Sequence, residues 1–419
     1  MNRSVRVALI VLAAIQAALF VYYLRANIIL EPYWDMYSHV TRYLQFRADG
    51  DWLRYLWDPH VQHRHLWMRL LTWLDAGLFS GISYPFIAAA TACQLVTAAL
   101  VWREAARVAP AGLRTAAGCL AVMLVLTSVA AVDAALPINT VYPQVVMFSV
   151  LAIVLFADGP AWRRVAAVAA AVAAAFANTL ALVLWPILVW MAWREGKGAR
   201  WIAALSAVGV AFIVRFVIGL PLADQAAAAP AALVTRLDYL ASYMGLPWTR
   251  AAALAIPGRL LGIALFVTGG AIVARVTLRD RPDRHHRVAG AFIALSLASA
   301  VLAAAGREPN PGEVLVPVRY SVLLAPLHVG LVMIAAMHAA DRAVLAMKAA
   351  VAAALLLVVQ QVGAGQGAIE NTTRVRDTVR RFAAGQTEAG MERVVFDDLP
   401  EARRQLDAIQ DAQLYTNVR

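Results

Sequence analysis

Long apolar runs recur along almost the whole chain, and they limit its possible folds more than any single motif does. Hydrophobic residues make up 62% of the 419 residues and charged residues 15%, which is far from the balance of a soluble domain of this length. A helix needs about 20 apolar residues to cross the hydrocarbon core of a membrane, so we predict an all-α, polytopic transmembrane bundle of about eleven spans. The spans are expected near residues 7–24, 84–102, 115–132, 143–157, 163–177, 180–193, 201–220, 260–277, 288–305, 320–340 and 343–361.

The chain divides into an apolar and a polar part. Residues 1–362 are predicted to form the bundle, and within them residues 25–83 form a first outer loop with interfacial helices. Residues 363–419 are polar and charged, which favours an outer tail that acts as a small cap or a membrane-surface arm. Two of the predicted spans, 163–177 and 180–193, are short and directly joined, so a re-entrant pair is the alternative to two crossings.

The distribution of Arg and Lys predicts how the spans are oriented. Basic residues gather in short loops at 103–114, 163–164, 194–200 and 275–287, whereas the opposite loops carry few of them. By the positive-inside rule the N-terminus is cytoplasmic, and the first loop and the tail share the outer, periplasmic face. The Ala-rich, Arg-rich and Lys-poor composition is typical of a bacterium, so we expect its inner membrane. The net charge of +11 is attributed to topology, and no nucleic-acid partner is expected.

Several kinds of site are excluded by what the sequence lacks. No G-x-x-x-x-G-K-[ST] or G-x-G-x-x-G element is present and the cytoplasmic loops are short, so an energy-rich donor would arrive on the outer face or within the lipid. Cys93 and Cys119 lie inside apolar runs, which indicates packing and neither a disulfide framework nor a metal site. The outer polar segments are therefore where we expect the chemistry.

The most informative polar segment runs from Glu31 to Arg69, directly after the first span. Its apolar and aromatic residues between Pro32 and Gly50 fall at helical spacing, and Trp52–Trp57 is predicted to be a second short helix at headgroup level. Asp35 is costly to bury there and gains nothing as an anchor, so it is our candidate general base. A surface carboxylate or helix cap is the alternative. The remaining carboxylates stand beside Gly or Pro and are expected to be caps: Asp49, Asp51 and Asp58.

A histidine-rich run, His60-Val-Gln-His63-Arg64-His65, follows these helices. Imidazoles are common metal ligands, but on a regular helix the rings of His63 and His65 diverge, so three ligands would need an irregular turn. A divalent metal is therefore not favoured, and no cofactor is assigned. We expect Arg64, His63 and His65 to recognise a phosphate or a sugar hydroxyl at the membrane surface, with a solvated helix end as the alternative.

A second outer constellation lies at residues 306–320. Its Gly and Pro residues mark an ordered turn, after which Arg319 and Tyr320 open the next span at the depth of the bilayer surface. Arg307 and Arg319 suit bidentate recognition of a lipid-linked phosphate or pyrophosphate, and snorkelling to headgroup phosphates is the alternative. Arg215, near the outer end of its span, adds a cation at similar depth.

The order of these features resembles the GT-C superfamily of membrane glycosyltransferases. Three segments carry the resemblance: Pro32-Tyr-Trp-Asp35, His60-Val-Gln-His63-Arg64-His65, and Gly306-Arg307 with Arg319-Tyr320. It implies that the acidic residue of the first outer loop, here Asp35, is the catalytic base. It also implies a sugar donor linked to polyprenyl phosphate.

The chain departs from this pattern at two positions. In similar uncharacterised bacterial proteins the first motif is commonly Trp-Asp-Glu and the second Asn-Glu-His-Arg. Here Met36 stands in place of the second acid, and Gln62 replaces the Glu before His63. These departures argue against a metal-assisted mechanism and against a pair of catalytic carboxylates.

The sequence thus predicts an inverting glycosyltransferase that moves a sugar from a polyprenyl-phosphate carrier to a glycan or lipid acceptor on the outer face of the lipid membrane. The expected site residues are Asp35 as base, Arg64, His63, His65, Arg215, Arg307, Arg319 and Tyr320 for the carrier phosphate, and Trp34, Tyr37 and Trp57 for stacking on sugar. One alternative is a transporter or flippase for an anionic or lipid-linked substrate, in which the arginines line a pathway and Asp35 is a gate. Another is a structural partner that docks through its tail.

Overall fold

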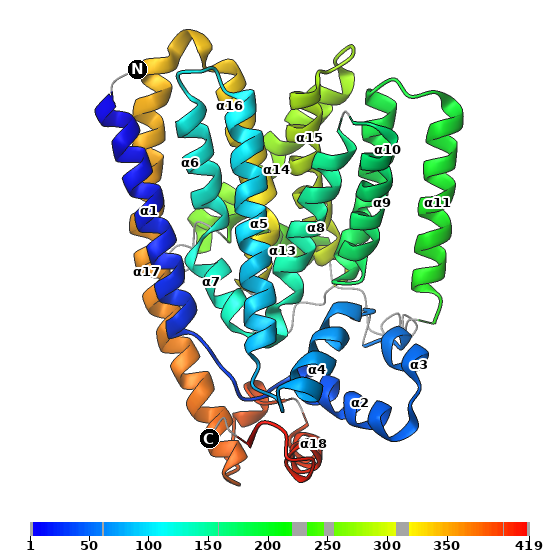
Figure 1. Ribbon diagram of the computed structural model, residues 1–419. Helices are drawn as coiled ribbons and strands as arrows, with labels where there is room; N and C mark the ends of the chain where they lie inside the picture. Colours follow the sequence, from blue (N-terminus) through cyan, green and yellow to red (C-terminus); the bar gives the residue numbers. More distant parts are fainter. Residues whose placement is uncertain are drawn as a thin grey trace.

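Helices long and apolar enough to cross a membrane dominate the structure (Figure 1). The structure is a computed structural model, and it describes residues 3–60, 63–157, 159–219, 233–246, 255–306, 318–396 and 398–416. Within these ranges eight helices meet this condition, and a bent pair would make a ninth. The prediction of an all-α, multi-pass helical bundle is thus confirmed. The eight are α1 (Arg3–Ala26), α5 (Tyr84–Val108), η1 (Pro137–Asn139) with α8 (Val141–Phe156), α11 (Ala199–Val217), α14 (Ala255–Leu278), α15 (Arg284–Gly306), η4 (Val318–Leu324) with α16 (Ala325–His338), and α17 (Ala343–Ala383), which follows η5 (Ala340–Arg342).

The predicted count of eleven spans is not supported. The apolar stretches at 163–177 and 180–193 form helices that are too short to count as spans: α9 (Ala161–Ala175), η2 (Thr179–Val183) and α10 (Leu184–Arg194). At 1.5 Å per residue α9 is about 22 Å long, whereas the hydrocarbon core is about 30 Å thick. The re-entrant pair therefore stays the alternative for this region.

The span predicted at 115–132 is broken. It consists of α6 (Arg114–Val125) and α7 (Ser128–Ala135), which are bent by 43° relative to each other. A break at this depth frees backbone N–H and C=O groups that lipid cannot satisfy. Other helices of the bundle must therefore supply hydrogen-bond partners.

Two glutamines from distant parts of the chain supply these partners. Gln16 of α1 donates its side-chain amide to the carbonyl oxygen of Leu126 at 2.7 Å. In α17, Oε1 of Gln361 accepts hydrogen bonds from the N–H of Ser128 at 2.5 Å and from its hydroxyl at 2.8 Å. Both glutamines are almost fully buried. The break between α6 and α7 is thus closed by side chains of α1 and α17.

A close backbone approach brings α13 (Leu233–Gly245) against α14. A Cβ added at Gly262 would lie 1.9 Å from the carbonyl oxygen of Ala241, so only glycine fits between the two helices. The packing places the ring of Tyr243 5.9 Å from that of Tyr320, in a stacked geometry. α13 thereby supports the start of η4.

Three helices form the first loop at one end of the bundle (Figure 1). They are α2 (Asp35–Asp49), α3 (Trp52–Trp57) and α4 (Leu66–Leu78). The first two agree with the helices predicted from the sequence, and Gly50 ends α2 in the left-handed conformation with φ 75°. No helix was predicted at α4, because its 13 residues are too few to cross a membrane and follow the irregular histidine run.

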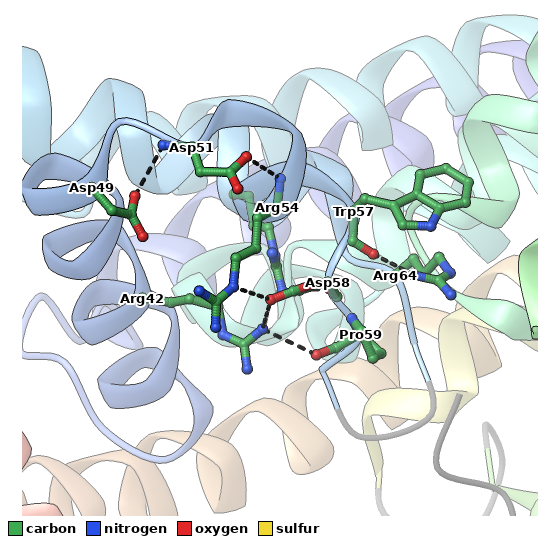
Figure 2. Close-up of polar contacts among 9 residues, drawn as sticks. Arg42, Asp49, Asp51, Arg54, Trp57, Asp58, Pro59 and Arg64 are labelled. Atoms are coloured by element: carbon green, nitrogen blue, oxygen red, sulfur yellow. Dashed lines mark hydrogen bonds and ion pairs between the residues drawn. The ribbon is translucent and has the colours of Figure 1, made fainter. Parts of the chain in front are cut away.

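The carboxylates expected to be caps have local structural roles (Figure 2). Asp51 caps α3 by accepting a hydrogen bond from the N–H of Arg54 at 2.9 Å, and Asp49 accepts one from the N–H of Asp51 at 3.0 Å. Asp58 is the C-cap residue of α3, and its side chain also forms ion pairs with Arg42 and Arg54 at 3.4 Å each. The sequence prediction therefore holds for Asp51 and Asp58, and Asp58 also ties α2 to α3.

The C-terminal tail continues α17 beyond the bundle and packs against the first loop, at the end opposite the N-terminus (Figure 1). α17 has 41 residues and is about 60 Å long, twice the thickness of the hydrocarbon core. Nε of Arg380, near its end, lies 2.6 Å from Oε1 of Glu31 in the loop. After η6 (Met391–Arg393), α18 (Leu399–Asp411) packs against α2. The tail is thus a docked cap on the loop.

A buried carboxylate fastens the end of the tail to α4. Asp75 is fully buried and accepts hydrogen bonds from the N–H groups of Ile82 and Ser83 at 3.0 Å each, and from the hydroxyl of Tyr415 at 2.8 Å. Burial raises the pKa of Asp75. Gly81 has φ 76°, and a Cβ there would lie 2.6 Å from the Tyr415 ring. The tail and the loop therefore share one interior.

We predict that Gln361→Leu destabilises the bundle more than Ser128→Ala does. The leucine variant leaves the N–H of Ser128 unpaired in an apolar interior, which costs about 1–3 kcal/mol, whereas the alanine variant removes one hydroxyl and keeps the backbone bond. Thermal unfolding of the purified protein in detergent measures both effects. A Gln361→Leu midpoint equal to that of the wild type would contradict this role of Gln361.

Candidate functional site

Asp35 is the first residue of α2 and lies just beyond the end of α1. Its side chain is 43% exposed, and Oδ1 lies 3.4 Å from Nε2 of His60. The residue before it, Trp34, has φ 50°, in the left-handed region that bulky side chains rarely adopt. The carboxylate is thus accessible, with an imidazole on one side and a constrained backbone on the other.

The surroundings of Asp35 favour its ionised form. Burial by itself raises the pKa of this carboxyl group, but the interaction with His60, 3.4 Å away, and the charge of Arg319 together bring the pKa below its ordinary value. The group is therefore ionised at neutral pH, and an ionised carboxylate can accept a proton from a hydroxyl. Asp35 has the protonation state that a general base needs.

His60 and His63 pair through their backbones, so they do not lie on a regular helix and the rings of the histidine run can converge. The N–H of His60 donates to the carbonyl oxygen of His63 at 2.8 Å, and the N–H of His63 donates back at 2.9 Å. The rings of His63 and His65 stack with centroids 4.9 Å apart and planes 10° from parallel. His63 is held further by the hydroxyl of Thr179, 2.6 Å from its Nδ1. The rings of His60, His63 and His65 thus lie close to one another, with His60 beside Asp35.

A fourth imidazole, His39, comes from α2 and is not among the site residues predicted from the sequence. Its ring centroid lies 4.6 Å from that of His60 and 5.7 Å from that of His65. His39 follows Asp35 by four residues, so both lie on one face of α2. This spacing is the signal in the sequence that could have identified it.

Two of the four imidazoles are neutral at neutral pH. Burial is the largest cause that lowers the pKa of His39 and of His65, and the charge of Arg69 lowers both pKa values further. His65 is 8% exposed, and neither of its ring nitrogens has a hydrogen-bond partner in the described part of the chain. Over the same residues no three His, Cys, Asp or Glu side chains are placed to hold one metal ion. The cluster can therefore pack closely without mutual repulsion.

A second residue that the sequence analysis missed is Arg69, the last residue of the polar segment. It is fully buried in α4, and Nη2 donates to the carbonyl oxygen of Asp58 at 2.6 Å. The hydroxyl of Tyr55 donates to the carbonyl oxygen of Arg69 at 2.7 Å, and its ring lies 5.7 Å from the guanidinium carbon. Burial lowers the pKa of Arg69 to about 10, so it stays charged. No sequence pattern distinguishes this arginine from an exposed one.

Arg64, predicted to bind a carrier phosphate, instead connects the first loop to α11. Nε donates to the carbonyl oxygen of Phe216 at 2.9 Å and Nη2 to that of Ile218 at 2.6 Å. Nη1 donates to the carbonyl oxygen of Trp57 (Figure 2). Carbonyl groups at the C-terminus of a helix have no partner within the helix, so Arg64 caps α11. A phosphate would have to compete with these bonds.

Arg215, in α11, shares the Trp57 indole with Arg64. The guanidinium carbon of each arginine lies 4.6 Å from the centroid of the Trp57 ring. Burial and the charge of Arg215 lower the pKa of Arg64. Arg215 is exposed and makes no hydrogen bond or ion pair with the residues that the structure describes. It is therefore the better placed of the two to receive an anion.

Arg319 and Tyr320 lie at the start of η4, within a group of tyrosines. The Arg319 side chain hydrogen-bonds those of Tyr320 and Tyr142, and its guanidinium carbon lies 5.7 Å from the Tyr320 ring. Tyr320 in turn meets Tyr142 edge-on, with ring centroids 5.4 Å apart. The charge of Arg319 also acts on Asp35. Arg319 therefore lies near enough to Asp35 for its charge to act on the carboxylate.

The predicted sugar-stacking residues are partly covered by protein. Tyr37 is 1% exposed and meets the ring of Phe396 edge-on at 6.5 Å. Trp34 is half-buried, and its ring lies 6.4 Å from that of Phe396. Arg307, the remaining predicted phosphate ligand, lies outside the described residues. Trp34 is thus the more accessible of the two aromatic residues beside Asp35.

Comparison with known proteins gives no independent assignment. No protein-family model, no curated protein and no solved structure matches the chain. The GT-C resemblance thus stays a prediction, and a function has to be argued from the geometry of the site.

We predict that His60→Ala raises the pH at which Asp35 becomes protonated. The interaction of His60 with Asp35 helps to keep the pKa of Asp35 low, so its loss moves the protonation step upward. Infrared difference spectra of the carboxyl band, with Asp35→Asn as reference, measure this titration. His63→Ala is the matched control, because His63 is not among the groups that lower the pKa of Asp35. An unchanged titration in His60→Ala would contradict the pairing.

Proposed function

We propose that the chain is a membrane glycosyltransferase that moves a sugar from a polyprenyl-phosphate carrier to a hydroxyl of a glycan or lipid acceptor. The observation that carries the proposal is the ionised, 43% exposed carboxylate of Asp35, directly after the first span and paired with His60. In this mechanism the acceptor oxygen attacks C1 of the sugar while Asp35 takes its proton. The bond from C1 to the carrier phosphate breaks on the opposite side, so the configuration at C1 inverts.

The leaving phosphate needs positive charge more than it needs a proton. Arg319 is the first residue that we assign to the leaving phosphate, because its charge acts on Asp35. Arg215 is the second, because its guanidinium is exposed and lies over Trp57. We assign Arg64 a positioning role, because its hydrogen bonds to the carbonyl groups at the end of α11 tie the first loop to that helix. Arg307 belongs to the same proposal on sequence grounds alone.

The proposed location is the inner membrane of a bacterium, with the site on the periplasmic side. The basic loops at 103–114, 194–200 and 275–287 lie at the end of the bundle where α1 begins (Figure 1). The first loop and the tail lie at the opposite end. Because basic loops stay in the cytoplasm, this arrangement supports a periplasmic site that meets its lipid-linked donor at the membrane surface.

A transporter or flippase is the second candidate, and one observation favours it. Broken helices within the membrane are common in transporters, where they surround a substrate site near the midplane. α6 and α7 form such a break. In this chain Gln16 and Gln361 already satisfy the freed backbone groups, and the charged cluster lies at the end of the bundle. The glycosyltransferase is therefore the better supported function.

We predict that Asp35→Asn lowers sugar transfer about 10²- to 10⁴-fold, because the amide cannot take the acceptor proton. Arg319→Ala is expected to raise KM for the donor. The measurement is transfer of radiolabelled sugar from a panel of polyprenyl-phosphate sugars by the purified protein in lipid nanodiscs. Carrier binding measured in the same nanodiscs separates loss of binding from loss of chemistry.

The matched control is Asp49→Asn, the same substitution at the other end of α2. Asp49 is exposed and bonds only the N–H of Asp51 among the described residues, so this variant is expected to keep wild-type transfer. Full activity of a normally inserted Asp35→Asn protein would refute the mechanism. Carrier binding or flux across vesicles without any transfer by the wild type would favour the transporter.

A further inference from the structure

The C-terminal tail contacts residues on both sides of Asp35. The N–H of Trp34 donates to the carbonyl oxygen of Val395 at 2.8 Å. The ring of Phe396 meets that of Trp34 at 6.4 Å and that of Tyr37 at 6.5 Å, edge-on in both cases. Residues directly before and shortly after Asp35 are thus held by two consecutive tail residues from the far end of the chain.

The backbone held in this way is strained. Trp34 has φ 50° and ψ −136°, a sparsely populated region that is unfavourable for a residue other than glycine. A conformation of this kind persists only where its surroundings fix it. The bond to Val395 and the contact with Phe396 supply that restraint. Without them Trp34 is expected to return to a negative φ and to turn the first residues of α2.

The tail is itself well fixed, so it can impose this conformation. Val395 is fully buried, and its N–H donates to the carbonyl oxygen of Met391 at 2.8 Å. On one side of this turn Arg380 is paired with Glu31, and on the other Tyr415 is bonded to the buried Asp75. The turn between them therefore has little freedom to move away from α2.

We propose that the tail segment Met391–Phe396 is a positioning element of the site, which fixes Trp34 and thereby directs the Asp35 carboxylate toward His60 and the acceptor. Val395 acts through its backbone carbonyl and Phe396 through its ring, and neither is proposed to touch substrate. The consequence for turnover rests on the proposed function. The consequence for the backbone of α2 does not.

The test compares Phe396→Ala, Phe396→Trp and the control Phe46→Ala in the full-length protein. Phe46 is also a half-buried ring in the loop, but it contacts Trp52 and Tyr55 near the far end of α2. Three quantities are measured: amide hydrogen exchange of the peptide spanning Trp34–Tyr37, titration of Asp35 by infrared difference, and kcat and KM for sugar transfer. Monodispersity in detergent shows which variants fold.

In Phe396→Ala we expect exchange of the Trp34–Tyr37 peptide to rise about tenfold, because its backbone opens more often. Asp35 is expected to titrate at higher pH as its contact with His60 loosens. We expect kcat to fall about ten- to hundredfold with KM little changed, since a small misplacement of a reacting group costs this much. Phe396→Trp keeps an aromatic ring, so its amide exchange, Asp35 titration and kcat are expected to stay close to those of the wild type. Phe46→Ala should change none of them.

Exchange equal to wild type in a folded Phe396→Ala protein would overturn the inference, and so would an equal rise in Phe46→Ala, which would indicate general loosening. If Phe396→Ala fails to fold, Phe396→Leu takes its place in the test, because leucine keeps the apolar volume and loses the ring contacts. The same exchange results then support or overturn the inference. If the wild type transfers no sugar from any donor, only the proposed function fails. The exchange and titration results then still decide whether the tail positions Asp35.

Discussion

A lipid interior offers no hydrogen-bond partner, and this constraint determines how the ends of the chain meet. The break between α6 and α7 is tolerated because Gln16 and Gln361 satisfy its backbone groups, which fixes the position of α17 along the bundle axis. Arg380 lies 19 residues further along the same helix, about 28 Å away at 1.5 Å per residue. There it reaches Glu31. A hydrogen bond inside the membrane therefore sets where the tail docks on the first loop.

Within the site, burial shifts the pKa values of neighbouring histidine and aspartate side chains in opposite directions. Burial disfavours charge, so it lowers the pKa of His39 and His65 and by itself would raise that of Asp35. His60 and Arg319 reverse the effect for Asp35 alone. An ionised carboxylate in the same cluster as the neutral imidazoles of His39 and His65 results, which is the separation of protonation states that acid–base chemistry requires.

The sequence was most informative where a property depends on neighbours along the chain. Helical spacing predicted α2 and α3, and the same spacing relates His39 to Asp35. The break within the span predicted at 115–132 could not be predicted, because it depends on glutamines from other helices. The roles of Arg64 and Phe396 were likewise hidden, since their partners lie far away in the sequence.

Membrane depth explains how residues far apart in the sequence can form one site. The length of α1 sets the depth at which the chain leaves the membrane before Asp35, and the candidate span Arg319–His338 sets the depth of Arg319. Both residues are thus brought to a similar depth. Depth alone leaves the direction of the Asp35 side chain undetermined. The tail contacts at Trp34 can supply that remaining restraint, because they act on the backbone one residue before the carboxylate.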